Sequence, residues 1–322
     1  MCVGRNGRAR RVIILHSLKS LLGLRAVLVT GKGGVGKTTV SAALARAAAA
    51  TGKRVLCTEM YSDAEQGSPL AAALGVPELG DQPVEIAPGI RAAVLSPSLG
   101  HHKFLRDVLP MKLLGDAAMR SAAIRRFFSA APTFPEMGVL YRLLDLVRDK
   151  RRDGTFEHEL IIVDLPATGH ALALAQIPES LLKVIPTGAV ADAVREGLAF
   201  LRDPEQTGAV VVTLPENLPV SEAIELTHAI HTHQIPLAHV FVNRVPYDPF
   251  GPGERELLAR VLDGKPPVLG ARSLDRIDRA RDALARLTRE VRAPLSVVQD
   301  VWLEGPRLAE EVASLFSMER FA

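Results

Sequence analysis

A short apolar run that ends in a glycine-rich loop constrains the fold of this chain more than any other feature. Residues 26–30 are apolar or β-branched at consecutive positions, as expected of a strand buried on both faces. The loop after them has the spacing of a phosphate-binding loop, in which a glycine and four further residues precede Gly-Lys and a hydroxyl residue. It reads Gly31-Lys32-Gly33-Gly34-Val35-Gly36-Lys37-Thr38-Thr39. Because residues 37–50 have helical character, the sequence predicts a strand, a phosphate loop and a helix in succession.

The chemistry of phosphate binding accounts for the residue types of this loop. Glycines let the backbone curl so that successive N–H groups point at phosphate oxygens, and the following helix adds the positive end of its dipole. Lys37 is then expected to neutralise the β- and γ-phosphates, and the Thr38 hydroxyl to ligate Mg²⁺. We therefore expect ATP and Mg²⁺ as cofactors. The alternative, a purely structural glycine turn, leaves Lys37 and its hydroxyl neighbour unexplained.

Strands and helices alternate along the chain. Consecutive apolar residues predict buried strands at 26–30, 54–58, 160–164, 209–213, 238–243 and 295–298. Helical patterns lie between them, for example at 221–233. Such alternation implies right-handed crossovers. The predicted fold class is therefore α/β, a P-loop NTPase with a doubly wound, mostly parallel sheet and helices on both faces.

One segment breaks the alternation, because no strand is evident from about residue 101 to residue 152. Its apolar pattern predicts helices, so we expect a helical insertion within a single ATPase domain at residues 24–316. Residues 317–322 are expected to form a tail. Residues 1–23 are expected to form a flexible basic extension, with four arginines and no acid in the first eleven positions. That extension is a solvated tail, an arm for an anionic surface, or sequence upstream of the true start.

Composition excludes several classes of function. The chain has 39 basic and 36 acidic residues, so its net charge of +3 gives no reason to expect a nucleic acid partner. No run approaches the roughly 18 apolar residues of a membrane span, so no integral membrane segment is expected. The two cysteines, Cys2 and Cys57, disfavour a disulfide framework and a four-thiolate metal site and suit a cytoplasmic location.

A second lysine in the loop, Lys32, carries a family resemblance. The loop resembles the deviant Walker A motif of the group that contains the arsenite-pump ATPase (ArsA), the guided-entry ATPases for tail-anchored proteins, MinD and ParA. In that family the extra lysine reaches across a dimer interface to the nucleotide of the other subunit. The resemblance therefore implies a homodimer in which Lys32 acts between subunits. The alternative is a solvated surface lysine.

The predicted strand at 160–164 narrows the resemblance. It ends in Asp164 and is followed by Leu165-Pro166-Ala167-Thr168-Gly169-His170, which is similar to switch II of the ArsA and guided-entry branch. The resemblance implies that Asp164 holds the Mg²⁺ shell and that the Gly169 amide senses the γ-phosphate. It also implies that Asn243, in Val242-Asn243-Arg244, reads the adenine edge. Taken alone, Asp164 would be a helix cap and Asn243 a turn residue.

The segment after the second predicted strand departs from the family. Switch I usually reads Ser-Thr-Asp-Pro there, and an ungapped alignment places Tyr61 at the position of the aspartate that orients the attacking water. Either Glu59 or Asp63 takes that role, with a slight preference for Glu59, or hydrolysis is slow. The helical insertion lies between this segment and switch II. The expected catalytic set is thus Lys32, Lys37, Asp164 and one of these two carboxylates.

The sequence therefore predicts a nucleotide-gated homodimeric ATPase that binds and releases a client protein or a membrane-associated partner. An ATP-binding switch with negligible turnover and a targeting factor for membrane proteins stay open as alternatives. Arsenite extrusion is disfavoured because residues 101–152 contain no cysteine. Met111, Met119 and Met137 in the insertion fit either an ordinary core or an adaptable client groove.

Overall fold

One continuous sheet forms the centre of the molecule. The computed structural model describes residues 12–14, 18–60, 67–100, 103, 134–167, 170–184, 186–263 and 270–317. Within these ranges, the strands lie in the order β1-β9-β8-β7-β2-β6-β3-β5-β4. They are β1 (Val12–Ile14), β2 (Ala26–Gly31), β3 (Val55–Met60), β4 (Val84–Ala87), β5 (Ile90–Leu95), β6 (Leu160–Asp164), β7 (Thr207–Thr213), β8 (Leu237–Val245) and β9 (Leu295–Gln299). Among the strands in the described part of the chain, only the edge strands β1 and β4 pair antiparallel with their neighbours.

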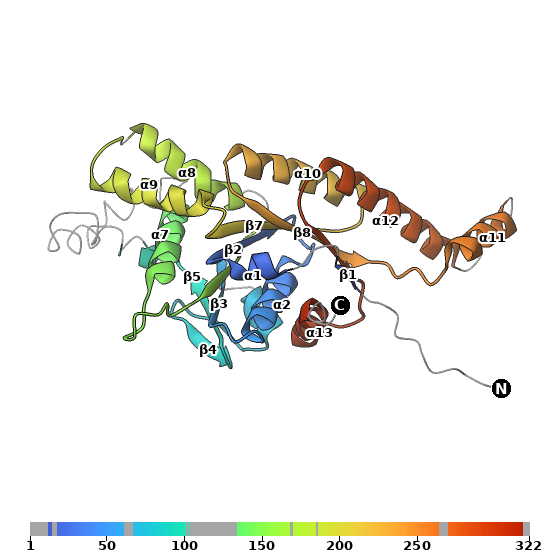
Figure 1. The fold of residues 1–322 in the computed structure, drawn as a ribbon, viewed down its shortest axis with the longest axis horizontal. Helices are drawn as coiled ribbons and strands as arrows, with labels where there is room; N and C mark the ends of the chain where they lie inside the picture. The colour runs from blue at the N-terminus through green and yellow to red at the C-terminus, as the bar shows by residue number, and fades with distance from the viewer. Residues whose placement is uncertain are drawn as a thin grey trace.

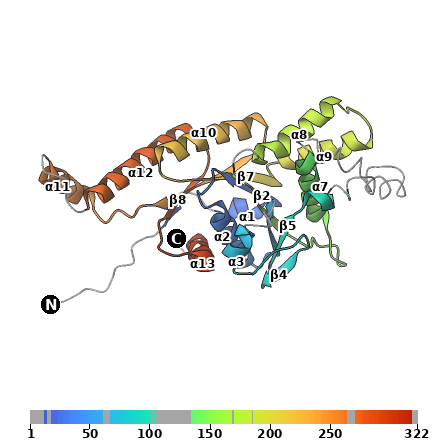
Figure 2. The same cartoon turned by 180° about the vertical axis from the view of Figure 1, so that it is seen from behind.

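Helices cover both faces of this sheet (Figure 1). They are α1 (Lys19–Gly23), α2 (Lys37–Ala49), α3 (Pro69–Leu74), α7 (Phe134–Arg148), α8 (His170–Val184), α9 (Ala189–Arg202), α10 (Asn217–Thr232), α11 (Pro252–Leu262), α12 (Ala271–Glu290) and α13 (Gly305–Ser317). Figure 2 shows α2, α3 and α13 on one side of the sheet, with α7 to α10 and α12 on the other. The prediction of an α/β P-loop fold is confirmed.

Alternate residues of β2 belong to two apolar cores, one on each face of the sheet. Val27 and Val29 pack with apolar residues of α2, α3 and α13, whereas Ala26 and Leu28 pack with α7, α8 and α9. A further core lies between the sheet and α10 and α12. Because β2 is buried on both faces, it is apolar at consecutive positions rather than at every second one. This is the pattern from which the strand was predicted.

Helix α13 holds α2 in place from the outside. Val312 and Phe316 of α13 belong to the same apolar cluster as α2, and Glu310 forms a 3.5 Å ion pair with Arg46 of α2. The apolar face of α13 is therefore used within the chain. None of the helices within the described ranges combines the length and the hydropathy needed to cross a bilayer.

Three strands, namely β1, β4 and β5, were not predicted, and part of the start of the chain differs from expectation. Strands β4 and β5 were not recognised because Val84 and Glu85 are exposed and Arg91 interrupts β5. Residues 1–23 were expected to be flexible, but their described part contains β1, which pairs with β9, and α1, which buries Leu21. Of residues 101–152, the structure describes Lys103 and residues 134–152, where α7 is helical as expected. The rest of the insertion and residues 318–322 lie outside the described ranges.

Candidate nucleotide-binding site

The glycine-rich loop joins β2 to α2 at the middle of the sheet, between β7 and β6. Gly31 closes β2 with a φ of +148°, and a Cβ at this position would lie 2.2 Å from the carbonyl oxygen of Val212 on β7. Gly36 caps α2 with a φ of +94°, and a Cβ there would lie 2.2 Å from Nδ2 of Asn243. Both ends of the loop therefore require glycine, because neighbouring strands approach its backbone closely.

Asn243, on β8, holds the loop from the side. Its Nδ2 donates a 2.9 Å hydrogen bond to the carbonyl oxygen of Val35, and its Oδ1 accepts 3.0 Å from the N–H of Arg244. The side chain is buried, so the carbonyl of Val35 depends on this partner. Asn243 therefore stabilises the conformation of the loop through Val35. Its adenine contact stays a prediction.

Asp164, at the end of β6, meets two hydroxyl groups of α2. Thr38 Oγ1 donates to its Oδ2 at 2.6 Å and Ser41 Oγ to its Oδ1 at 3.2 Å. Burial raises the pKa of Asp164 to about 6, against the hydrogen bond from Thr38 and the charge of Lys37. Hydroxyl and carboxylate oxygens are the donors that Mg²⁺ takes from proteins. Thr38 and Asp164 thus fit the expected ion, and Ser41, one helical turn beyond Lys37, is a neighbour that the motif alone did not identify.

The two lysines of the loop point to different partners. Lys37 Nζ donates 3.1 Å to the carbonyl oxygen of Lys32, and burial lowers the pKa of Lys37, although Asp164 opposes that shift. Lys32 is half exposed, and its Nζ lies 2.7 Å from Oε1 of Glu222 on α10. Lys37 therefore lies over the phosphate loop, whereas Lys32 is bound to a different helix. Sequence reasoning missed Glu222, which lies 190 residues away and carries no motif.

Glu59 is buried at the end of β3, opposite Asp164 in the register of β3 and β6. Its Oε2 accepts 3.1 Å from the N–H of Leu70 in the first turn of α3. Among the described residues its Oε1, although buried, has no hydrogen-bond partner. Burial raises the pKa of Glu59, against hydrogen bonds from Ser68 and Leu70. The carboxylate therefore lies beside the site with one oxygen engaged by α3.

Several residues that the sequence predicted for the site lie close together in its described part: the loop, Lys37, Thr38, Asp164 and Asn243. It places Lys32 at the rim and Glu59 on the strand beside Asp164. Four residues that entered the sequence argument, namely Tyr61, Asp63, Thr168 and Gly169, lie outside the described ranges. Their expected roles stay predictions.

Comparison with known proteins identifies relatives that are named as ATPases. ATPase BagA of Mycobacterium tuberculosis is 30% identical over 229 residues, which make up 70% of this chain and 66% of that protein. The arsenical pump-driving ATPase of Acidiphilium multivorum is 33% identical over 215 residues, 62% of this chain and 35% of that protein. ATPase ASNA1 homolog 1 of Paramecium tetraurelia is 29% identical over 162 residues, half of this chain and 45% of that protein.

A family model covers the first half of the fold. The model described as anion-transporting ATPase matches residues 24–189, a segment that contains both phosphate motifs, Lys37 and Asp164. This match extends over more than half of the chain and agrees with the resemblance inferred from the loop and from switch II. The chain belongs to the anion-transporting ATPase family.

Proposed function

We propose that this protein binds ATP with Mg²⁺ and hydrolyses it as a homodimer, and that the nucleotide cycle drives binding and release of a partner protein. The observation that carries the proposal is the 2.6 Å contact between Thr38 and Asp164 at the mouth of the phosphate loop. It joins the hydroxyl that follows the loop lysine to the carboxylate that ends a neighbouring strand. In P-loop NTPases these two groups are the protein's contribution to the Mg²⁺ site.

The described residues divide the work of nucleotide binding. The backbone N–H groups of the loop and the N-terminus of α2 receive the phosphates, and Lys37 neutralises their charge. Thr38, and Asp164 through water, would hold Mg²⁺, and the ion would supply neutralisation of the phosphate charge. Asn243 keeps the loop in its curled form through Val35. Glu59 or Asp63 orients the attacking water.

The second lysine supports the proposal of a homodimer. Lys37 already lies over the loop of its own chain, so Lys32 is not needed there, and it is half exposed at the rim. In the deviant Walker A family that the loop resembles, the lysine at this position acts on the nucleotide of the other subunit. A closed two-fold dimer then makes two identical sites, each completed by the lysine of its partner.

The partner is a protein, or a membrane-associated assembly, rather than a metalloid. Relatives include an arsenical pump-driving ATPase, but the thiol chemistry that suits arsenite is poorly represented here. The chain has two cysteines, and burial raises the pKa of Cys57 well above its usual value, so that its thiol is neutral and enclosed. Met137 packs with Ile177 and Val194, which favours a core role for that methionine. We place the action of this ATPase in the cytoplasm.

Steady-state ATP hydrolysis tests the proposal. We expect Mg²⁺-dependent turnover in the wild type, loss with Lys37→Ala and Asp164→Asn, and loss with Lys32→Ala even though that side chain points away from its own loop. Lys53→Ala, at a lysine four residues beyond the end of α2, is the matched control and should retain full activity. Undiminished turnover of Lys32→Ala would refute the action between subunits. A partner is then sought by affinity isolation with nucleotide-trapped Asp164→Asn protein.

A second candidate, an ATP-binding switch with negligible turnover, is favoured by one observation. One oxygen of Glu59 is engaged by the N–H of Leu70, which makes this carboxylate a brace for α3 as well as a candidate for orienting water. Activity measurements on Glu59→Gln and Asp63→Asn separate the two functions. If the wild type binds ATP without hydrolysing it, the protein is an ATP-binding switch. If one variant alone abolishes turnover, the ATPase is correct and that carboxylate orients the water.

A further inference from the structure

Ser41 is a hydroxyl residue buried on a helix whose inner side is otherwise apolar. It is 0% exposed, and the other buried residues of α2 are alanine, valine and leucine. Serine is a poorer helix former than alanine, and removing its hydroxyl from water costs free energy unless the hydroxyl finds a hydrogen-bond partner. The presence of serine at this position of α2 is therefore explained by what its side chain contacts.

The hydroxyl of Ser41 is directed differently from other helical hydroxyl groups of this chain. Three such groups on α10, one on α12 and one on α13 donate to a backbone carbonyl oxygen three or four residues earlier in the same helix. This is a common arrangement of serine and threonine in helices. Ser41 Oγ donates instead to Oδ1 of Asp164 at 3.2 Å. Its single hydroxyl hydrogen is therefore used on a carboxylate at the end of β6.

Thr38 and Ser41 contact the two oxygens of Asp164 from one face of α2. Residues three apart in a helix lie on the same face. Thr38 Oγ1 donates to Oδ2 at 2.6 Å, while Ser41 binds Oδ1. The terminal torsion of an aspartate is broad, so a single hydrogen bond leaves the carboxylate free to rotate, whereas donors on both oxygens fix its plane. Without Ser41, Thr38 alone among the described residues would remain as a side-chain hydrogen-bond partner of this carboxylate.

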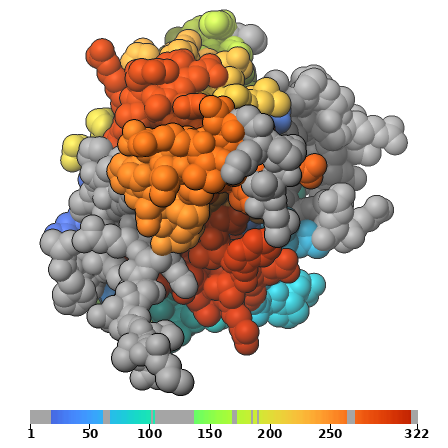
Figure 3. Space-filling view, turned by 90° about the vertical axis from the view of Figure 1, so that its right-hand side faces the viewer, coloured from blue at the N-terminus to red at the C-terminus, as the bar shows by residue number. Residues whose placement is uncertain are grey.

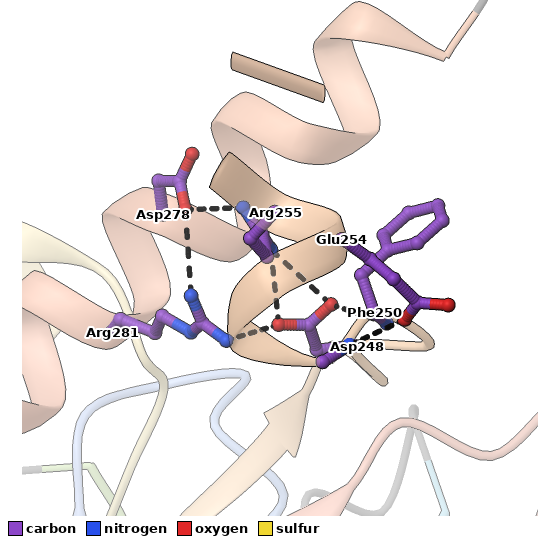
Figure 4. A network of polar contacts seen from close by, with 7 residues as sticks. Asp248, Phe250, Glu254, Arg255, Asp278 and Arg281 are labelled. Carbon is purple, nitrogen blue, oxygen red and sulfur yellow. Dashed lines mark hydrogen bonds and ion pairs between the residues drawn. The ribbon is translucent and has the colours of Figure 1, made fainter. Parts of the chain in front are cut away.

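Asp248 shows the other way in which this chain fixes a carboxylate. It precedes α11, which stands with α12 at the outside of the molecule (Figure 3). Arg255 donates to it at 3.2 Å, and Arg281 of α12 also binds it (Figure 4). These arginines neutralise the carboxylate as well as orient it. Within the described residues, Asp164 instead receives its side-chain hydrogen bonds from neutral hydroxyl groups, and Lys37 acts on it by charge alone. Asp164 is thus oriented without being paired to an arginine, as suits a group that serves a cation.

The burial of Ser41 separates its role from that of Thr38. Thr38 is partly exposed, whereas Ser41 lies one helical turn further along α2 and has no contact with solvent. A hydroxyl has one hydrogen and two acceptor lone pairs. Thr38 gives its hydrogen to Asp164, which leaves its lone pairs for an ion, but an ion at the loop does not meet Ser41. Ser41 therefore acts through Asp164.

We propose that Ser41 is a positioning residue for the Mg²⁺ site, because its hydrogen bond to Oδ1 keeps the carboxylate of Asp164 directed at Thr38. The inference rests on the proposed function, since it takes Thr38 and Asp164 as the residues that would hold the ion. It adds a residue from the interior of α2 to that site. Loss of such an outer partner of a metal-binding group typically lowers metal affinity about 10–100-fold.

The affinity of full-length protein for a non-hydrolysable ATP analogue, measured by calorimetry with Mg²⁺ and with EDTA, tests this role. Ser41→Ala should weaken binding about tenfold with Mg²⁺ and leave binding in EDTA unchanged. Ser296→Ala is the matched control, because Ser296 is also 0% exposed and its Oγ lies 2.8 Å from one side chain, Nε2 of His239. It should change neither affinity. Added to Asp164→Asn, Ser41→Ala should cause no further loss, because the group through which it acts is already gone.

The outcomes separate this inference from the proposed function. An equal loss of affinity with Mg²⁺ and with EDTA overturns the role of Ser41 at the ion, because the residue then only supports the fold of α2. Unchanged affinity in Ser41→Ala, or the same Mg²⁺-specific loss in Ser296→Ala, also overturns it while the proposed function stands. If the wild type binds the analogue no better with Mg²⁺ than in EDTA, both are wrong. Circular dichroism and thermal unfolding confirm that each variant remains folded.

Discussion

The ammonium of Lys32 lies 2.7 Å from the carboxylate of Glu222, so the second lysine of the phosphate loop is bound to α10 of its own chain. A lysine that acts on a second copy has to leave this ion pair first. The two side chains are partly exposed, and ion pairs of that kind contribute about 0.2–1 kcal/mol. The ion pair with Glu222 therefore weakly opposes the movement of Lys32 toward a second copy.

Glu222→Gln should remove this ion pair and leave Lys32 free to act on a second copy. We expect the nucleotide-dependent dimer to tighten by about 2–5-fold, the factor that corresponds to an exposed ion pair. Glu225→Gln, one turn further on the same helix and exposed, is the control and should leave the dimer Kd unchanged. Sedimentation with the ATP analogue measures both. A weaker dimer in Glu222→Gln would instead mean that Glu222 helps Lys32 to reach its target.

Asp164 should make the stability of the nucleotide-free protein depend on pH. Its pKa in the folded state, about 6, lies above the ordinary 3.8, so the folded protein binds more protons between these values. Stability is therefore highest below the lower value and falls as pH rises through the upper one. Asp164→Asn removes the buried charge and should raise the free energy of unfolding at about pH 7 by up to about 3 kcal/mol.

The difference between wild type and Asp164→Asn isolates this effect from other titrating groups. Urea unfolding at about pH 4 and about pH 7 should show a difference that is small at the lower pH and large at the higher one. Binding of Mg²⁺ with ATP has the opposite dependence, because a proton on Asp164 competes with the ion as pH falls through about 6. A pH-independent difference would refute this account of Asp164.

Asn243→Ala should weaken the loop before any nucleotide is present. The substitution leaves the buried carbonyl of Val35 without its partner, which costs about 1–3 kcal/mol of unfolding free energy. Urea unfolding without nucleotide measures the loss, and Asn217→Ala, at the exposed start of α10, serves as the control. An unchanged stability together with lost preference for ATP over GTP would assign Asn243 to the base alone.

Two glycines of the loop should differ in their tolerance of alanine. Gly34 and Gly36 both have positive φ, +80° and +94°, but a Cβ at Gly34 meets open space, whereas one at Gly36 meets Asn243. Gly34→Ala should cost only the left-handed backbone strain, about 1–2 kcal/mol. Gly36→Ala should cost more, because Asn243 must also move away from the Val35 carbonyl. An equal loss of unfolding free energy in the two variants would show that the Asn243 side chain moves aside without cost.

Local signals explain why the site was largely predictable. The phosphate loop follows β2, and Asp164 ends β6; both strands are buried and apolar at consecutive positions. The fixed spacing of the loop motif then identifies Lys37 and Thr38. Relations between distant segments had no such signal. The contacts from Lys32 to Glu222 and from Asn243 to Val35 join residues roughly two hundred positions apart, and no periodicity reports on them.

Edge elements were harder to predict for a different reason. Strand β4 exposes Val84 and Glu85, and β1 has three residues, so neither produces a long apolar run. The sequence also shows Trp302 without showing whether it is buried, and a lone tryptophan is more often part of a core. Only the end of β9, placed next to Tyr247, reveals that this side chain faces solvent.

The packing of α13 against α2 has a consequence for synthesis of the protein. The phosphate loop and α2 are translated early, but the helix that covers α2 ends at Ser317. A nascent chain that stops before Gly305 leaves the apolar side of α2 open to water and to other unfinished chains. The outer side of α2, the helix that follows the phosphate loop, is therefore covered only after α13 has been translated.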